Sequence, residues 1–220
     1  MEDPGSSSIS YRDNWFDRLF IRLFSRKIAV ALGEQTQQAG YDGFVDLSQR
    51  IMAGRSPQEQ QQLVGVVLRS LVPAPVLWGV RTFFSPTPLV CELNAWFATR
   101  LFEWLVGPCT VQPAQVTTPS GAAREQKSMV KIERCRYLDQ SGCVAMCINM
   151  CKLPTQEFFT RDFGIPVTLT PNFEDFSCEM VFGSAPPPLQ SEAIATQPCL
   201  PRHCNQATPT DYRPCPKIHP

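Results

Sequence analysis

Hydrophobic residues recur every three or four positions along the first half of the chain, the spacing that places them on one face of a helix. Gly and Pro residues, which end or break helices, separate the segments that show this pattern. Four helices are therefore predicted in this half: residues 11–32, 42–54, 56–72 and 88–106. The third has the clearest start, because Ser56 and Glu59 form a capping box with Pro57 in the first turn.

The segment over residues 11–32 allows two interpretations. Its apolar face is rich in aromatic residues, and its polar face carries Arg12, Arg18, Arg22, Arg26 and Lys27 against Asp13 and Asp17. A helix packed on the core explains this pattern, and the residues alone favour it. A helix lying on a membrane surface explains it too, because such helices are basic on one face and aromatic on the other.

The second half of the chain changes character. Residues 112–128 are polar and are predicted to form a loop, and residues 129–137 are compatible with a strand. A cysteine-rich helix follows, and then a short helix that starts at Pro154 and ends at Gly164. No internal repeat is evident in either half.

The clearest β-hairpin of the chain comes next. Apolar residues alternate with others from Ile165 to Thr170, and residues 172–175 supply turn formers. The strand after the turn carries four residues on one face: Phe176, Cys178, Met180 and Phe182. The chain beyond Gly183 is rich in Pro and poor in apolar residues.

These patterns predict an α+β fold, in which a helical N-terminal half packs with a small antiparallel sheet and a Cys-rich helix. Residues 1–10 are expected to be disordered. Residues 11–183 are expected to form a single domain with a helical half (11–107) and a Cys-rich half (108–183). Residues 184–220 form a Pro-rich C-terminal tail that is expected to pack on the domain through its cysteines.

Composition narrows the class of protein. The 220 residues are 43% hydrophobic with 14 Phe, and 20 basic residues balance 20 acidic ones. Because no global basic field is present to attract phosphates, nucleic acid is not an expected partner. The start has neither the apolar segment of a signal peptide nor the Arg-rich composition of a transit peptide. No transmembrane span is expected, since no long uncharged apolar window occurs.

Ten cysteines and two histidines are the main candidates for chemistry. Cys143, Cys147 and Cys151 recur at every fourth residue, which makes them neighbours on one face of a helix. Such thiols form disulfides, bind zinc, or bind iron or an iron–sulfur cluster. No C-x-x-C pair occurs, which weakens the zinc interpretation, and the ferredoxin spacing is absent too.

Helix geometry limits what these three thiols can do. Eight residues of regular helix rise about 12 Å, so one metal ion cannot bind both Cys143 and Cys151. Either two thiols share a site, or a cluster spans them, or the helix is broken near Gly142. Further ligands would come from Cys135, Cys178, Cys199 or Cys204. Both histidines lie in the tail, which argues against a multi-histidine iron site and a Ser–His–Asp triad.

Four stretches of the sequence resemble a known family: YRDNWFDRLF, CELNAWFATRLFEWLVGPC, KIERCRYLDQSGCVAMCINMCKLPTQEFFT and FGIPVTLTPNFEDFSCEMVFG. With them the chain resembles the plant plastid β-carotene isomerases of strigolactone biosynthesis and their paralogues. The resemblance spans most of residues 11–204, and QPCLPRHC is similar to the closing cysteine pair of that family.

The resemblance implies an iron-dependent enzyme of the plastid that interconverts all-trans- and 9-cis-β-carotene, upstream of the carotenoid cleavage dioxygenases. A carotenoid has to come from a membrane or a plastoglobule, so peripheral association with such a surface is expected, with the helix over residues 11–32 as the contact. Two other classes stay open, namely a non-catalytic carotenoid-binding or metal-cluster carrier and a disulfide-stapled scaffold.

The candidate site residues form two groups. The metal group, for a thiolate-bound iron or an iron–sulfur cluster, is Cys143, Cys147 and Cys151, then Cys135 and Cys178, with Cys199 and Cys204 of the tail. The candidates for an apolar substrate cleft are Phe176, Met180 and Phe182, since a hydrocarbon binds by burial of apolar surface. For each of these residues, a plain role in the core is the alternative.

Overall fold

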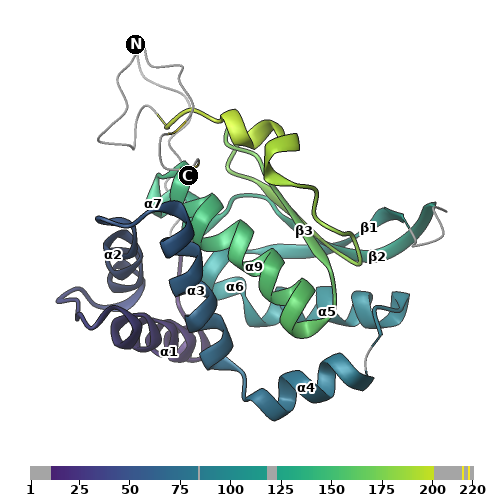
Figure 1. Ribbon diagram of the computed structural model, residues 1–220, viewed down its shortest axis with the longest axis horizontal. Helices are drawn as coiled ribbons and strands as arrows, with labels where there is room; N and C mark the ends of the chain where they lie inside the picture. Colours follow the sequence, from purple (N-terminus) through teal and green to yellow (C-terminus); the bar gives the residue numbers. More distant parts are fainter. Residues whose placement is uncertain (1–10, 84, 118–122, 201–214, 216–217, 219–220) are drawn as a thin grey trace.

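The computed structural model describes residues 11–83, 85–117, 123–200, 215 and 218, and Figure 1 shows how its elements are arranged. The described helices of the first half are α1 (Trp15–Leu32), α2 (Gly40–Met52), α3 (Pro57–Leu71), α4 (Ala74–Phe83), α5 (Pro88–Leu101) and α6 (Glu103–Val106). Helices α1, α2 and α3 pack on one another, whereas α5 packs on the sheet. The helical first half is therefore confirmed.

Local sequence explains where the first helices begin and end. Asn14 caps α1, because its side-chain oxygen accepts hydrogen bonds from two backbone N–H groups of the first turn. Gly33 ends α1 in the left-handed conformation, with φ of 71°. Ser56 and Glu59 form the predicted capping box at the start of α3. Gly33 and the Ser56 capping box lie where the sequence predicts them, whereas α1 begins at Trp15, four residues later than predicted.

The described strands form one antiparallel sheet in the order β1-β2-β4-β3. The strands are β1 (Cys109–Thr117), β2 (Ala123–Ile132), β3 (Val167–Pro171) and β4 (Cys178–Phe182). The predicted hairpin is confirmed as β3 and β4. Met180 pairs with Val130 on one side and Leu169 on the other, so these three side chains lie on the same face of the sheet.

The chain between β2 and β3 is helical but irregular. It contains α7 (Arg136–Ser141), α8 (Val144–Met146), the π-helix η1 (Cys147–Lys152), α9 (Leu153–Glu157) and the π-helix η2 (Phe158–Phe163). The run from α8 to η2 lies between α3 and the sheet (Figure 1). A buried hydrogen bond of 3.0 Å from Asn149 Nδ2 to Gln60 Oε1 joins η1 to α3.

The predicted loop over residues 112–128 is wrong, because the described part of this segment forms most of β1 and β2. Its side chains are largely polar and exposed, and the two strands are held by a long antiparallel ladder. A strand of this kind has no apolar alternation to reveal it. The strand predicted over residues 129–137 begins earlier, at Ala123, and ends at Ile132 because Arg136 starts α7.

Two details of the helical half also differ from the prediction. No helix is predicted over residues 74–83, yet α4 forms there, and Pro75 sits in its first turn, where a missing N–H costs nothing. The helix predicted over residues 88–106 is interrupted at Phe102, whose φ of −109° and ψ of 5° separate α5 from α6.

The α+β class is confirmed, and the Cys-rich helix is present at Cys147–Cys151. Within the described tail are two 3-10 helices, η3 (Leu189–Ser191) and η4 (Ala193–Thr196). The tail buries Ile194, Leu200, Cys215 and Ile218 in the core. The predicted disordered start over residues 1–10 and Cys204 lie outside the described residues. No single described helix is long and apolar enough to cross a bilayer, although α3 and α4 pass that test together across an 88° bend.

Candidate functional site

An apolar cavity lies between the helices of the first half and the sheet. Its empty space, including the open mouth, is about 1350 Å³. Phe24 of α1, Ile51 of α2 and Val67 of α3 line it from the helical side, and Val130 and Met180 line it from the sheet. The cavity therefore forms where the helical half meets the face of the sheet that carries Val130 of β2 and Met180 of β4.

Few polar side chains face this cavity. The two larger ones, Tyr137 and Lys152, each interact with a neighbouring side chain. The hydroxyl of Tyr137 interacts with Ser48, and burial raises the pKa of Tyr137 well above its usual value, so the phenol stays neutral. Lys152 Nζ donates hydrogen bonds to Gln156 Oε1 (3.0 Å), to the Leu169 carbonyl and to Glu192 Oε2 (2.8 Å).

Because Lys152 has all three N–H donors satisfied, its ammonium group has none left for a ligand. The cavity thus presents mainly hydrocarbon and sulfur to anything that enters it. Such a surface suits an apolar ligand that needs no hydrogen bonds.

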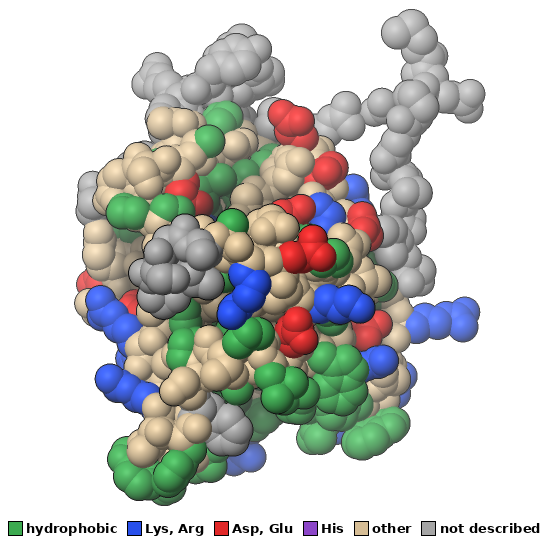
Figure 2. Space-filling view, turned by 90° about the vertical axis from the view of Figure 1, so that its right-hand side faces the viewer, with side chains coloured by type: hydrophobic (Ala, Val, Ile, Leu, Met, Phe, Trp, Pro, Cys, Tyr) green, Lys and Arg blue, Asp and Glu red, His purple; other side chains and the backbone are tan. Residues whose placement is uncertain are grey.

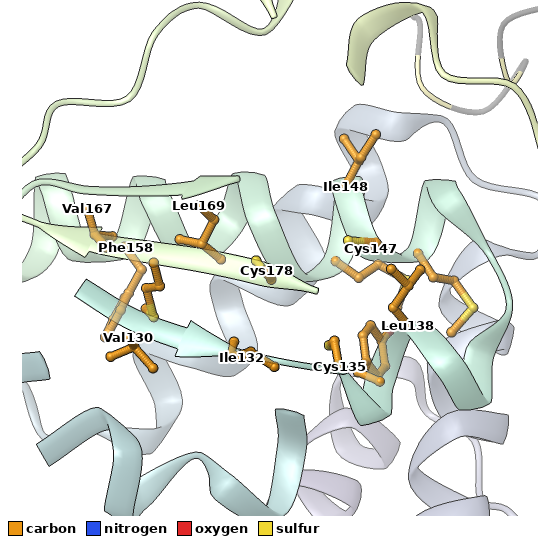
Figure 3. Close-up of a cluster of buried hydrophobic side chains, with 14 of the residues drawn as sticks. Val130, Ile132, Cys135, Leu138, Cys147, Ile148, Phe158, Val167, Leu169 and Cys178 are labelled. Carbon is orange, nitrogen blue, oxygen red and sulfur yellow. The ribbon is translucent and has the colours of Figure 1, made fainter. Parts of the chain in front are cut away.

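Four of the predicted metal-linked cysteines line this cavity: Cys135, Cys147, Cys151 and Cys178. They come from separate elements, because Cys135 precedes α7, Cys147 and Cys151 belong to η1, and Cys178 begins β4. Figure 3 shows Cys135, Cys147 and Cys178 within one cluster of buried apolar side chains. The fold therefore brings together thiols that are far apart in the sequence.

Burial governs the ionisation of these thiols. It raises the pKa of Cys147 and Cys178 well above the usual range, and the neighbouring thiols raise it further. Burial likewise raises the pKa of Cys151 to about 12. None of the four cavity cysteines forms a disulfide. Without a metal they are neutral thiols, which are poor nucleophiles.

The four thiols do not fit a single metal ion as they are placed here. In the part of the chain that the structure describes, no three His, Cys, Asp or Glu side chains are grouped closely enough to hold one. Their chemistry does suit iron, because sulfur ligands bind iron and iron–sulfur clusters. Binding iron would require the thiols to approach one another.

The other predicted metal-linked cysteines lie elsewhere. Gly142 ends α7 with φ of 56° and Cys143 follows in extended conformation, so Cys143 precedes the cysteine-rich helix and is partly exposed. Cys199 is partly buried in the tail, where it packs against the hydrophobic core. Neither is among the residues that line the cavity, whereas Cys109, which was not predicted, is among them.

The three predicted substrate residues lie in different places in the structure. Met180 lines the cavity. Phe182 does not; it is fully buried, with its ring centroid 5.4 Å from that of Phe159. Phe176 precedes β4 with φ of 64°, and its ring lies under the Arg134 guanidinium at 4.8 Å. Of the three, Met180 is the one placed to contact a ligand in this cavity.

The π-helical turn at Cys147–Lys152 has a local explanation. Pro154 has no N–H to donate to the carbonyl of Met150, four residues earlier. In the π-turn just before it, the N–H of Leu153 donates to the carbonyl of Ile148, five residues earlier. The wider turn changes which side chains share a face, and it places both Cys147 and Cys151 at the cavity. π-turns of this kind are frequent at functional sites.

Sequence reasoning missed most of the cavity wall. The helices of the first half contribute Val64 and Leu68 of α3 and Ala98 and Phe102 at the end of α5. Their apolar spacing is the same whether they pack on another side chain or border an empty space, so it carries no signal for a cavity. The buried position of Lys152 could not be predicted from the sequence either, since it depends on partners in β3 and the tail.

Comparison with known proteins gives independent information. Residues 104–191 match the family described as "Beta-carotene isomerase D27-like, C-terminal". That range contains Lys152 and all five cysteines that line the cavity. No solved structure is significantly similar to this one.

Two curated relatives match most of the chain. "Beta-carotene isomerase D27, chloroplastic" of Medicago truncatula is 37% identical over 189 residues, which cover 86% of this chain and 73% of the relative. The protein of the same name from Arabidopsis thaliana is 33% identical over 202 residues, which cover 91% of this chain and 75% of the relative. The similarity therefore extends beyond the C-terminal region into the helical half.

Proposed function

The chain belongs to the family of D27-like β-carotene isomerases, and from that premise we propose that it is a carotenoid cis–trans isomerase. Its reaction would interconvert all-trans- and 9-cis-β-carotene. The observation that supports this best is the apolar cavity lined by the helical half, the sheet and five cysteine thiols. A cavity whose described lining offers no available charged group suits a hydrocarbon substrate.

The residues of the cavity would act mainly by binding and orientation. Cis–trans isomerisation transfers no atom, but one double bond has to lose its π-character briefly while the rest of the polyene stays in place. Walls that hold the polyene, such as those formed by Phe158, Phe159 and Met180, would restrict rotation to one bond. A site catalyses rotation only if it stabilises the twisted polyene more than the planar one.

Iron is a separate proposal. The residues that would bind it are Cys135, Cys147, Cys151 and Cys178, the four predicted metal-linked cysteines among the five that line the cavity. When bound, iron would supply one-electron exchange with a polyene. Among the described residues no three ligands are grouped closely enough for one ion, so iron binding would need these thiols to move closer together.

The biological setting follows from the relatives and is proposed on that basis. Both are named chloroplastic, which supports a plastid location for this protein. We propose that it serves strigolactone biosynthesis by supplying 9-cis-β-carotene to carotenoid cleavage dioxygenases. Because carotenoids dissolve in lipid, peripheral association with a plastid membrane or a plastoglobule belongs to the same proposal.

The experiment that tests the function starts from each isomer separately. Purified protein is incubated with all-trans- or 9-cis-β-carotene in detergent micelles, and the isomers are separated by chromatography over time. An isomerase brings both samples to the same ratio of isomers, faster than micelles without protein. A carrier would bind carotene and change its absorption spectrum while leaving the rate at that of the protein-free control, and this result would contradict the proposal.

A further inference from the structure

Helix α5 buries its small residues and exposes its large apolar ones, which is the reverse of the usual arrangement. Its buried residues are small: Cys91, Ala95, Ala98 and Thr99. Its exposed face carries the large apolar residues Leu89, Leu93, Trp96 and Phe97, each of which is more than half exposed. In a globular protein the large apolar face of a helix normally meets the core, so this stripe is an exposed apolar patch that needs an explanation.

Helix α4, which precedes α5 along the chain, extends the same feature. It has no buried residue at all, although its sequence is mostly apolar. Trp78 is 65% exposed and Phe83 is 74% exposed, with their rings packed edge to face at 6.1 Å. Figure 2, which shows the right-hand side of the view in Figure 1, has hydrophobic side chains gathered toward its lower edge.

Charge on this surface has one sign. Residues 74–101 contain three charged residues, Arg81, Glu92 and Arg100. The two arginines are exposed. Glu92 is partly buried, and its carboxylate accepts a hydrogen bond of 2.9 Å from the Lys127 backbone N–H. The surface is therefore apolar and aromatic with cationic groups at its margin, a combination that suits the headgroup region of an anionic lipid surface.

The surface also adjoins the cavity. Helix α4 connects α3 to α5, and both neighbours contribute partly exposed side chains to the cavity wall: Val64 and Leu68 from α3, and Phe102 at the end of α5. Helix α4 itself packs on η2, whose Phe158 and Phe159 line the cavity. A ligand that leaves a lipid phase at this surface would therefore be next to the wall of the cavity.

We propose that the exposed apolar side chains of α4 and α5 form a membrane-docking surface, and we call this set the α4–α5 surface: Val76, Trp78, Phe83, Leu89, Leu93, Trp96 and Phe97. Its partner is a lipid surface that carries anionic headgroups, and it delivers the apolar substrate to the cavity. This inference rests on the proposed function for the identity of the substrate. It moves the membrane contact away from α1, where the family resemblance led us to expect it.

The test measures lipid binding without carotenoid. Full-length protein is mixed with vesicles of phosphatidylcholine, with or without a minor share of phosphatidylglycerol, and bound protein is recovered by flotation. We expect binding that increases with phosphatidylglycerol. In the variant Trp78→Gln/Leu93→Gln/Trp96→Gln we expect vesicle binding to fall at least about tenfold, equivalent to about 1.4 kcal/mol.

Two matched variants make the test specific. Trp15→Gln/Leu19→Gln/Leu23→Gln removes the same number of exposed apolar residues from α1, and it should keep most of the vesicle binding. Trp78→Phe/Trp96→Phe keeps the apolar character and should bind like the unmodified protein. Loss of binding in the α1 variant together with normal binding in the α4–α5 variant would overturn the proposal.

Other outcomes are equally decisive. Absence of vesicle binding by the unmodified protein would overturn it, as would a dimer in sedimentation that the α4–α5 variant converts to a monomer. Isomerisation in detergent micelles is measured in parallel, because micelles need no docking. A variant that keeps activity in micelles but loses it on vesicles supports the docking surface. Absence of activity in micelles for the unmodified protein would instead contradict the proposed function and leave the flotation result valid.

Discussion

Lys152 and Glu192 form a buried ion pair that joins the cysteine-rich π-helix to the tail. Lys152 Nζ lies 2.8 Å from Glu192 Oε2, with side-chain exposures of 1% and 13%. Lys152 also donates to Gln156 and to the backbone of Leu169 in β3, so three elements meet at one ammonium group. The pair holds the tail and the sheet against the helix that lines the cavity.

This arrangement predicts a large cost for removing Lys152. In the variant Lys152→Met the Glu192 carboxylate is left buried without its cation, and we expect the free energy of unfolding to fall by about 3–5 kcal/mol. The exposed pair Arg161–Glu157 offers a control, since Arg161→Ala should change stability by less than about 1 kcal/mol. Urea unfolding measures both.

A double variant separates the charge effect from packing. Lys152→Met/Glu192→Gln removes both charges, so it should be more stable than Lys152→Met alone. Equal stability of the single and double variants would show that Glu192 is not penalised by losing its partner.

Residues that cap or end a helix can be recognised in the sequence, so a helix with such residues at its ends can be predicted. Gly33 at the end of α1 and Ser56 at the start of α3 are such residues, and both act as expected in the structure, whereas the cap at Asn14 was not predicted. The same signals do not tell which face of a helix meets the core. In α5 the large residues face outward, because β2 packs closely only against small residues such as Ala95.

Long-range contacts explain what the sequence could not show about the site. The spacing of Cys143, Cys147 and Cys151 suggests one face of one helix. Gly142 interrupts the helix before Cys143, however, and the π-turn alters which side chains share a face. Cys178 joins the cavity only because β4 pairs with β2. Which thiols share the cavity therefore depends on sheet pairing, which no local pattern specifies.

Filling the cavity should abolish activity without unfolding the protein. Ala98 lines the cavity, whereas Ala95, one turn earlier on α5, is buried outside its lining. We expect Ala98→Phe to occupy the space for substrate and reduce isomerisation in micelles at least about tenfold, with little loss of stability. Ala95→Phe overpacks the contact with the sheet and should cost about 1–3 kcal/mol of stability. Normal activity of a folded Ala98→Phe variant would show that substrate binds elsewhere.

The proposed role of the cavity thiols in binding iron leads to a comparison of two buried cysteines. Cys147 lines the cavity, and Cys91 of α5 is also buried but is not among the lining residues. After anaerobic purification we expect Cys147→Ser to lower the iron content per chain several-fold and Cys91→Ser to leave it unchanged. Iron analysis and the thiolate-to-iron absorption band measure this without any activity assay. Equal iron in both variants would remove Cys147 from the ligand set.

The thiol of Cys109 provides a prediction about pH. Burial, and secondarily the Glu103 carboxylate, raises the pKa of Cys109 from 9.0 to about 11. Because the thiolate is the reactive form, alkylation of Cys109 should still accelerate at about pH 10, where the unfolded chain has reached its plateau. Mass spectrometry of peptides after brief alkylation measures the rate at this residue.

The same shift in the pKa of Cys109 has a consequence for stability. The folded pKa is raised, so the contribution of this thiol is complete below about pH 9, the pKa of the unfolded chain. It decreases as the pH rises from 9.0 toward about 11, because the unfolded chain loses the proton first. Glu103→Gln removes a charge that raises the pKa and should move the alkylation profile to lower pH, whereas Arg100→Gln should move it to higher pH. Profiles unchanged in both variants would show that burial alone controls this thiol.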